Sequence, residues 1–160
     1  MRRLDRIPFV GTVKRLLEAV RVDRHIQYAR DLMVVGKYEQ ALDEFKAANR
    51  HGVAFTPRDI LLFSHCLSVL GKPVQAFSSA EIVERRLLED SRRFNKNEVA
   101  YMIAYSRLIR NKCAGDVQNL AKFVVPINYS AIELSSVSDD LLATFPLVNH
   151  PDWNALGWKG

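Results

Sequence analysis

Histidine and cysteine are the residues of this sequence whose chemistry could support a metal site. The chain contains four His and two Cys. His65 and Cys66 are adjacent, so on a helix their side chains point about 100° apart and cannot easily share one ion. No two histidines stand four residues apart, and a zinc site needs three or four converging ligands. We therefore expect no metal and no cofactor, and we interpret Cys66 as a small core residue.

Sequence motifs of nucleophilic catalysis and of phosphate binding are also missing. A catalytic nucleophile needs a positioned base and an oxyanion donor. The patterns G-x-S-x-G, G-x-x-x-x-G-K and G-x-G-x-x-G do not occur, and the seven glycines fall mostly at expected helix ends. We expect no catalytic residues and no enzymatic activity.

The net charge of +5 is concentrated at the start of the chain. Residues 1–30 carry all of it, because basic and acidic residues balance over residues 31–160. A nucleic-acid-binding protein usually spreads its basic residues over the folded face. The distribution therefore argues against nucleic acid as the main partner.

The first 21 residues admit two interpretations as a helix and a third as a disordered tail. Apolar residues from Val13 to Val20 recur with a helical period, which predicts an amphipathic helix. This helix either caps the folded core or attaches to an anionic membrane, nucleic acid or partner through its basic residues. The second interpretation assigns the anionic contact to Arg2, Arg3, Arg6, Lys14 and Arg15.

Length and composition predict one soluble domain. A chain of 160 residues is long enough for a core of its own, and no run approaches the roughly 18 apolar residues of a membrane span. The two cysteines form no C-x-x-C pair, and no secretory pattern follows the basic start. We expect a cytoplasmic protein that could touch a membrane surface but is not integral to it.

Two stretches of the chain repeat each other at a fixed distance. Val35–Ala48 reads VGKYEQALDEFKAA and Leu70–Phe77 reads LGKPVQAF. Gly, Lys, Gln and Ala match between the two stretches at one offset of 35 residues. A period in the mid-thirties, with Gly between two helical patterns, predicts stacked helical hairpins.

Helix-start and helix-stop signals divide the chain into three such pairs. Thr56-Pro57-Arg58-Asp59 and Asn95-Lys96-Asn97-Glu98 are typical helix starts, and Gly36 and Gly71 are typical helix ends. The charged end of the fourth helix, from Glu84 onward, is interpreted as a solvated face. The expected helices are Asp23–Val35, Tyr38–His51, Pro57–Leu70, Pro73–Arg92, Val99–Arg110 and Asp116–Val125, with Asn111–Gly115 as a loop and a short helix over Leu141–Phe145.

The repeated residues resemble the tetratricopeptide repeat (TPR) family. In the first repeat the resemblance is carried by Ala29, Gly36, Lys37, Tyr38, Ala41, Phe45 and Ala48, and in the second by Ser64, Leu67, Gly71, Lys72 and Ala76. The sequence departs from the family at His25 and Ile60, where the family has Trp, and the third repeat is degenerate.

The resemblance implies an all-α fold, a right-handed stack of antiparallel helical hairpins that forms a TPR-like superhelix. It has two clear repeats, a degenerate third and terminal caps. We expect one domain over residues 1–160, divided into a basic capping helix at 1–21, repeats at 22–55, 57–92 and 95–125, and a capping tail at 126–160. If either cap is incomplete, a homodimer supplies the missing surface.

The family also implies a function in protein–protein interaction, as an adaptor, scaffold or regulatory subunit that binds a peptide or helix of a partner. The family's clamp for acidic peptide ends is not present, although Arg30, Arg58 and His65 could favour acidic segments. Tyr101 or Tyr105 could continue the groove. The residues expected to line the concave groove are Gln27, Arg30, Val34, Arg58, Leu62, His65 and Val69.

Overall fold

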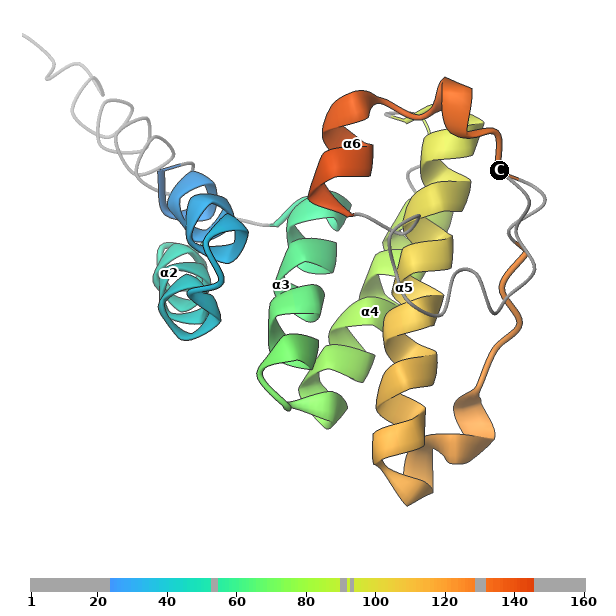
Figure 1. The fold of residues 1–160 in the computed structure, drawn as a ribbon, viewed down its shortest axis with the longest axis horizontal. Coiled ribbons are helices and arrows are strands. Elements are labelled where there is room, and N and C mark those ends of the chain that lie inside the picture. Colours follow the sequence, from blue (N-terminus) through green and yellow to red (C-terminus); the bar gives the residue numbers. More distant parts are fainter. Residues whose placement is uncertain (1–23, 53–54, 90–91, 93, 129–131, 146–160) are drawn as a thin grey trace, which may run out of the picture. The chain divides into compact units, whose positions relative to one another are not determined.

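The computed structural model describes residues 24–52, 55–89, 92, 94–128 and 132–145. Every regular element in these ranges is a helix, and they contain no strand (Figure 1). The expected all-α class is confirmed. The predicted N-terminal helix, its five basic contact residues and most of the capping tail lie outside the described residues. The chain divides into two compact units, Met1–Ala54 and Phe55–Gly160.

The first unit contains a helical hairpin made by a helix over residues 24–34 and by α2, Tyr38–Arg50. Gly36 joins the two helices with a φ of 76°, a left-handed conformation that glycine adopts at little cost. The Lys37 N–H donates to the Leu32 carbonyl at 2.8 Å, and the Gly36 N–H donates to the Met33 carbonyl at 3.0 Å. This pair of bonds satisfies carbonyl groups that the ending helix leaves open.

The interior of the hairpin is formed by the residues that the helical period predicts to be buried. The buried set is Ile26, Ala29, Leu32 and Met33 from the first helix, and Ala41, Leu42, Phe45 and Ala48 from α2. Small alanines let the two helices approach, and Phe45 fills the space between them.

The second unit begins with a hairpin of the same design, formed by α3 (Pro57–Val69) and α4 (Pro73–Glu89). Thr56 and Asp59 form the predicted capping box at the start of α3. Gly71 has a φ of 68°, and Lys72 N–H donates to the Leu67 carbonyl at 3.0 Å. The Gly-Lys match between the repeats therefore reflects the same turn with the same hydrogen bonds.

α5, Lys96–Asp116, is longer than predicted and lies against both α3 and α4 (Figure 1). Asn95 and Glu98 form the predicted capping box. The expected loop Asn111–Gly115 is wrong, because α5 continues through it. Cys113 and Ala114 in that stretch are buried in the core, and this burial favours continued helix over the weak stop signal of Gly115.

The second helix of the third pair, expected at Asp116–Val125, is also wrong. Its place is taken by a 3-10 helix, η2 (Gln118–Phe123), and by extended chain to residue 128. None of the η2 residues is buried. Without an apolar stripe to bury, this stretch lacks the packing that stabilises most α-helices in proteins.

The described part of the C-terminal region covers one end of the second unit. It contains a 3-10 turn, η4 (Leu134–Ser136), and α6, Asp139–Thr144, which begins at the predicted N-cap Ser138. Figure 1 shows α6 over the start of α3. Phe145 at the end of α6 is fully buried, and its carbonyl accepts a hydrogen bond from the Tyr101 hydroxyl.

Candidate functional site

Three of the predicted groove residues, Gln27, Arg30 and Val34, lie on the helix of residues 24–34 in the first unit. Gln27 is exposed, and its Nε2 donates to Asp31 Oδ1 at 3.2 Å. Arg30 is half-buried, and Val34 is 86% exposed. These residues therefore belong to a unit that is described separately from the other four.

The other four groove residues lie on α3, but the side chains of two of them are already engaged within the chain. Leu62 is buried in the core. Arg58 binds α6, where its Nη2 lies 2.5 Å from Asp140 Oδ2 and 3.0 Å from Thr144 Oγ1. The Arg58 guanidinium, expected to attract acidic segments, thus makes an intramolecular ion pair in the structure. His65 and Val69 remain at the surface.

His65 and Val69 lie beside a small hollow between α3 and α5, which we call the α3–α5 hollow. Its volume is about 40 Å³, which suits one inserted side chain, because pockets for small molecules are typically about 300–1,000 Å³. The lining residues are His65, Ser68 and Val69 from α3, and Tyr105, Leu108, Ile109 and Lys112 from α5.

A hydrogen bond across the α3–α5 hollow holds His65 in place. His65 Nδ1 lies 2.8 Å from the Tyr105 hydroxyl, and the two ring centroids are 5.7 Å apart. Tyr105 is buried and also packs its ring against Phe145 at 5.2 Å. Tyr105 thus reaches the site as expected, whereas Tyr101 is fully buried and does not reach the surface.

The lining of the hollow carries positive but no negative charge. Lys112 is exposed at its edge, and no Asp or Glu is among the lining residues. The apolar members Val69, Leu108 and Ile109 make up much of the surface. This combination suits an apolar side chain followed or preceded by an acidic one.

The two cysteines near this region are structural. Burial raises the pKa of the Cys66 thiol to about 11. Burial also raises the pKa of the Cys113 thiol, although a hydrogen bond with Ser68 opposes the effect. Both thiols therefore stay protonated at neutral pH, and the protonated form is a poor nucleophile and metal ligand. The interpretation of Cys66 as a core residue is confirmed, since it is fully buried.

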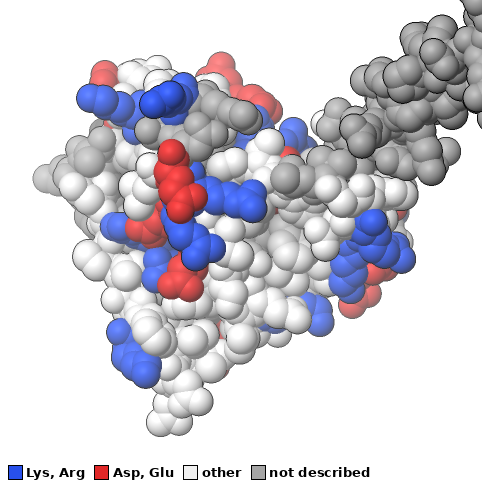
Figure 2. Space-filling view, turned by 180° about the vertical axis from the view of Figure 1, so that it is seen from behind, with Lys and Arg blue, Asp and Glu red and all other residues white. Residues whose placement is uncertain are grey.

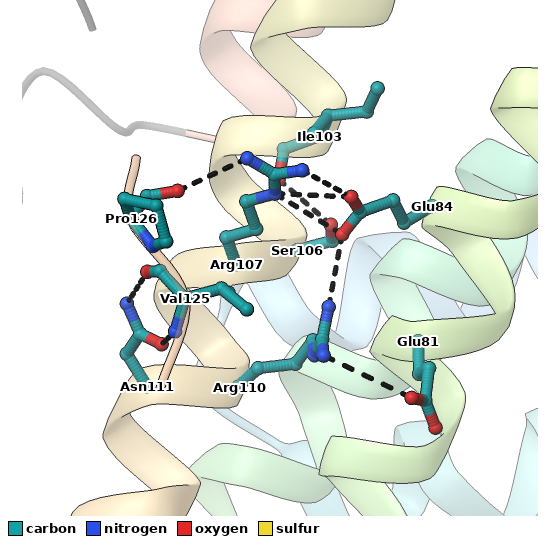
Figure 3. Close-up of polar contacts among 9 residues, drawn as sticks. All are labelled: Glu81, Glu84, Ile103, Ser106, Arg107, Arg110, Asn111, Val125 and Pro126. Carbon is teal, nitrogen blue, oxygen red and sulfur yellow. Dashed lines mark hydrogen bonds and ion pairs between the residues drawn. The ribbon is translucent and has the colours of Figure 1, made fainter. Parts of the chain in front are cut away.

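Ionisable side chains form a second cluster, between α4 and α5, which we call the ionic cluster: Glu81, Glu84, Arg107 and Arg110 (Figure 3). Glu84 accepts hydrogen bonds from Arg107 Nε at 3.1 Å and from Arg110 Nη1 at 3.0 Å. The hydrogen bond to Glu84 raises the pKa of the Arg107 guanidinium. Glu81 contributes a longer contact, 3.9 Å from Arg110 Nη2.

The ionic cluster corrects one sequence interpretation. The side chain of Glu84 is only 14% exposed, so it does not belong to a solvated helix face. Arg107 and Arg110 stand three residues apart and therefore lie on one side of α5. The three-residue spacing of the two arginines was visible in the sequence. That Glu84 lies opposite them is shown only by the tertiary packing.

Charged side chains of both signs stand together on the surface. Figure 2 shows acidic and basic side chains interleaved along the centre of one face. Among the residues that the structure describes, no three His, Cys, Asp or Glu side chains gather as a metal site would require. The same residues include no helix that is both long and apolar enough to span a bilayer.

Comparisons with known proteins found no family model, no curated protein and no solved structure that matches this chain.

Proposed function

We propose that the protein is an interaction module, an adaptor, scaffold or regulatory subunit, that binds a peptide or helix of a partner protein at the α3–α5 hollow. In this proposal α3 is the first helix of one complete repeat of a TPR-like superhelix, and α5 is the first helix of a degenerate repeat that lacks its second α-helix. Both helices would then contribute to its concave face. The turn shared by Gly36 and Gly71 supports the repeat arrangement.

The observation that carries the proposal is the position of Val69. This apolar side chain is 43% exposed, and it borders a hollow whose wall is also formed by Leu108 and Ile109. A partner's apolar side chain at the hollow removes mainly the exposed part of Val69 from water, at about 25 cal/mol for each Å² of apolar area, because Leu108 and Ile109 are already buried. Apolar anchors in small pockets dominate the binding energy of many interfaces.

His65 and Lys112 are the polar groups that would orient a partner at this apolar contact. The hydrogen bond to Tyr105 fixes the His65 ring, so it reaches a partner without losing further side-chain freedom. Lys112 offers a positive charge at the edge of the hollow for a carboxylate beside the anchor. The proposed partner segment therefore carries an apolar residue next to an acidic one.

Selection from a displayed peptide library tests this proposal. The wild-type chain is panned first, and the enriched peptides are then measured against Val69→Glu, which places a charge beside the hollow. We expect enriched peptides to pair an apolar with an acidic residue, and to lose at least about tenfold in affinity for Val69→Glu. The measurement is fluorescence anisotropy at matched helical content.

Val74→Glu is the matched control. Val74 is also an exposed valine, 57% accessible, but it lies in the first turn of α4 and does not line the hollow. Binding that Val74→Glu reduces as strongly as Val69→Glu contradicts the proposal. Binding that both variants retain, but that deletion of residues 1–21 removes, favours the basic N-terminal segment as the attachment site.

A further inference from the structure

Phe123, the last residue of η2, and the irregular stretch of residues 124–127 lie along α5 and are held there by backbone hydrogen bonds; we call residues 123–127 the strap. Asn111 Nδ2 donates to the Val125 carbonyl at 2.8 Å, and Asn111 Oδ1 accepts from the Val125 N–H at 2.9 Å. Arg107 Nη1 donates to the Pro126 carbonyl at 3.1 Å. Figure 3 shows these side chains of α5 pointing together toward the strap.

This pattern of contacts recognises a main chain rather than particular side chains. One Asn amide satisfies both the donor and the acceptor of a single residue, as a neighbouring β-strand does. The contact with Pro126 likewise uses only its carbonyl. The same groups of α5 would therefore accept the backbone of another extended segment with equal geometry.

Side-chain burial holds the strap only in part, because Val125 and Ile127 are half-buried whereas its other side chains are exposed. Phe123 is 44% exposed and Val124 is 58% exposed. One apolar contact gives the site its preference: the Phe123 ring packs against Phe77 at 6.0 Å between centroids. The guanidinium of Arg110 lies 5.2 Å from the centroid of the Phe77 ring, so this ring is itself supported by the ionic cluster.

We propose that this face of α4 and α5 is a second peptide-binding surface, which the chain's own strap fills as an internal competitor. The partner that displaces the strap is an extended segment with an aromatic residue three positions before a proline, as in Phe123–Pro126. An internal segment competes at an effective concentration in the millimolar range. The surface is therefore closed to weak ligands until the strap is released.

This second surface is separate from the α3–α5 hollow. Arg107 and Asn111, four residues apart, lie on one side of α5, whereas Tyr105, Ile109 and Lys112 lie on another. None of the lining residues of the hollow makes the hydrogen bonds that hold the strap. The two proposals therefore stand or fall independently.

A single substitution releases the strap without altering its receptor. Val125→Pro removes the N–H that donates to Asn111, and Val124 has φ −61° and ψ 127°, which a following proline tolerates. Val125→Ala is the matched control, because it shortens the side chain but keeps the N–H. The probe is a fluorescent peptide with the sequence of residues 121–128, AKFVVPIN.

We expect the probe to bind the full-length Val125→Pro chain at least about tenfold more tightly than the wild type or Val125→Ala. Amide hydrogen exchange should show lost protection of the Val124 N–H, which donates to the Ala121 carbonyl in the folded chain, in Val125→Pro alone. Adding Asn111→Leu to Val125→Pro should abolish probe binding, and adding Val69→Glu should leave it unchanged. A probe in which alanine replaces the Phe should bind several-fold more weakly.

Four results would overturn the proposal. The first is a released strap without gain in probe binding, and the second is a strap that stays protected in Val125→Pro. The third is loss of the helical circular dichroism signal in Val125→Pro, which would make the strap an integral part of the core. The fourth is a dimer that forms in place of probe binding, which would show exchange of straps between two copies.

Discussion

The two sides of α5 are built by different kinds of interaction. Toward α3, the helix presents apolar side chains, a hydrogen bond between Tyr105 and His65 and another between Cys113 and Ser68, and it leaves a hollow. Toward α4 and the strap, it presents Arg107, Arg110 and Asn111, each of them bound to a charged or backbone group. An apolar wall accepts any side chain that fits, whereas the polar side accepts only groups of matching charge and geometry.

This difference decides what a partner has to displace in order to bind on each side of α5. Exchange on the apolar side replaces water in the hollow, and no bond within the chain has to break. Exchange on the polar side first requires the strap to leave, and exposed Arg107 and Asn111 then need new partners. In the two proposals above, the α3 side binds its partner constitutively, and the strap side binds only after release of the strap.

Among the changes that distinguish the two sides of α5, Glu84→Ala is expected to have the largest effect on the free energy of unfolding. This change leaves Arg110, which is almost fully buried, without its nearest carboxylate. Breaking a buried ion pair at one partner is strongly destabilising, and we expect a loss of about 3 kcal/mol in the free energy of unfolding, measured by urea denaturation.

Glu81→Ala is the control for that measurement. Glu81 is 60% exposed and 3.9 Å from Arg110, so its removal should cost under about 1 kcal/mol. Equal losses in the two variants would contradict the expectation that the buried Glu84 carboxylate is the main anionic partner of Arg110.

A smaller effect on stability is expected from alkaline pH, which acts on the buried Cys66 thiol of α3. The folded chain keeps the Cys66 thiol protonated up to about pH 11, whereas the ordinary pKa of the group is 9.0. The unfolded chain therefore loses this proton first, so stability falls as pH rises from about 9 to 11, by roughly 2 kcal/mol. Urea denaturation at a series of pH values measures the slope.

Cys66→Ala isolates this contribution to the pH dependence. The variant should lose the Cys66 share of the alkaline slope, although it is less stable at neutral pH because of the methylene-sized cavity. A slope that is as steep in Cys66→Ala as in the wild type would assign the alkaline loss to other groups.

The smallest effect is expected from Tyr105→Phe at the hollow. This change removes the hydroxyl that pairs with His65 Nδ1 and keeps the ring against Phe145. The free energy of unfolding should fall by only about 1 kcal/mol, but peptides selected on the wild type should bind more weakly, because His65 is no longer fixed. Unchanged affinity would remove His65 from the binding contact.

Local signals in the sequence predicted the elements whose stabilising groups are close together along the chain. The capping boxes at Thr56 and Asn95 each act over three residues. The turns at Gly36 and Gly71 are fixed by the glycine conformation and by hydrogen bonds over five residues or fewer. The helical period likewise identified the buried faces of the first hairpin.

Interactions between distant residues were not predictable in the same way. The length of α5 depends on burial of Cys113 and Ala114 by other elements. The ion pair between Arg58 and Asp140 joins residues 82 positions apart. Leu62 and His65 lie three positions apart on α3. Packing makes Leu62 a core residue, whereas His65 stays half-buried and bonds to Tyr105 of α5. The candidate site was therefore predicted in part, through His65 and Val69.

The pairing of α6 with the start of α3 has a consequence for how the protein is made. On the ribosome, α3 and α4 can form a hairpin soon after they emerge, because their turn is short and their contacts are local. Asp140 and Phe145 emerge later, at roughly 5–20 residues per second. For several seconds the nascent chain therefore carries the Arg58 guanidinium and the Tyr101 hydroxyl without the C-terminal groups that bind them. Translation speed through residues 117–145 thus sets how long the N-terminal end of α3 stays open to chaperones.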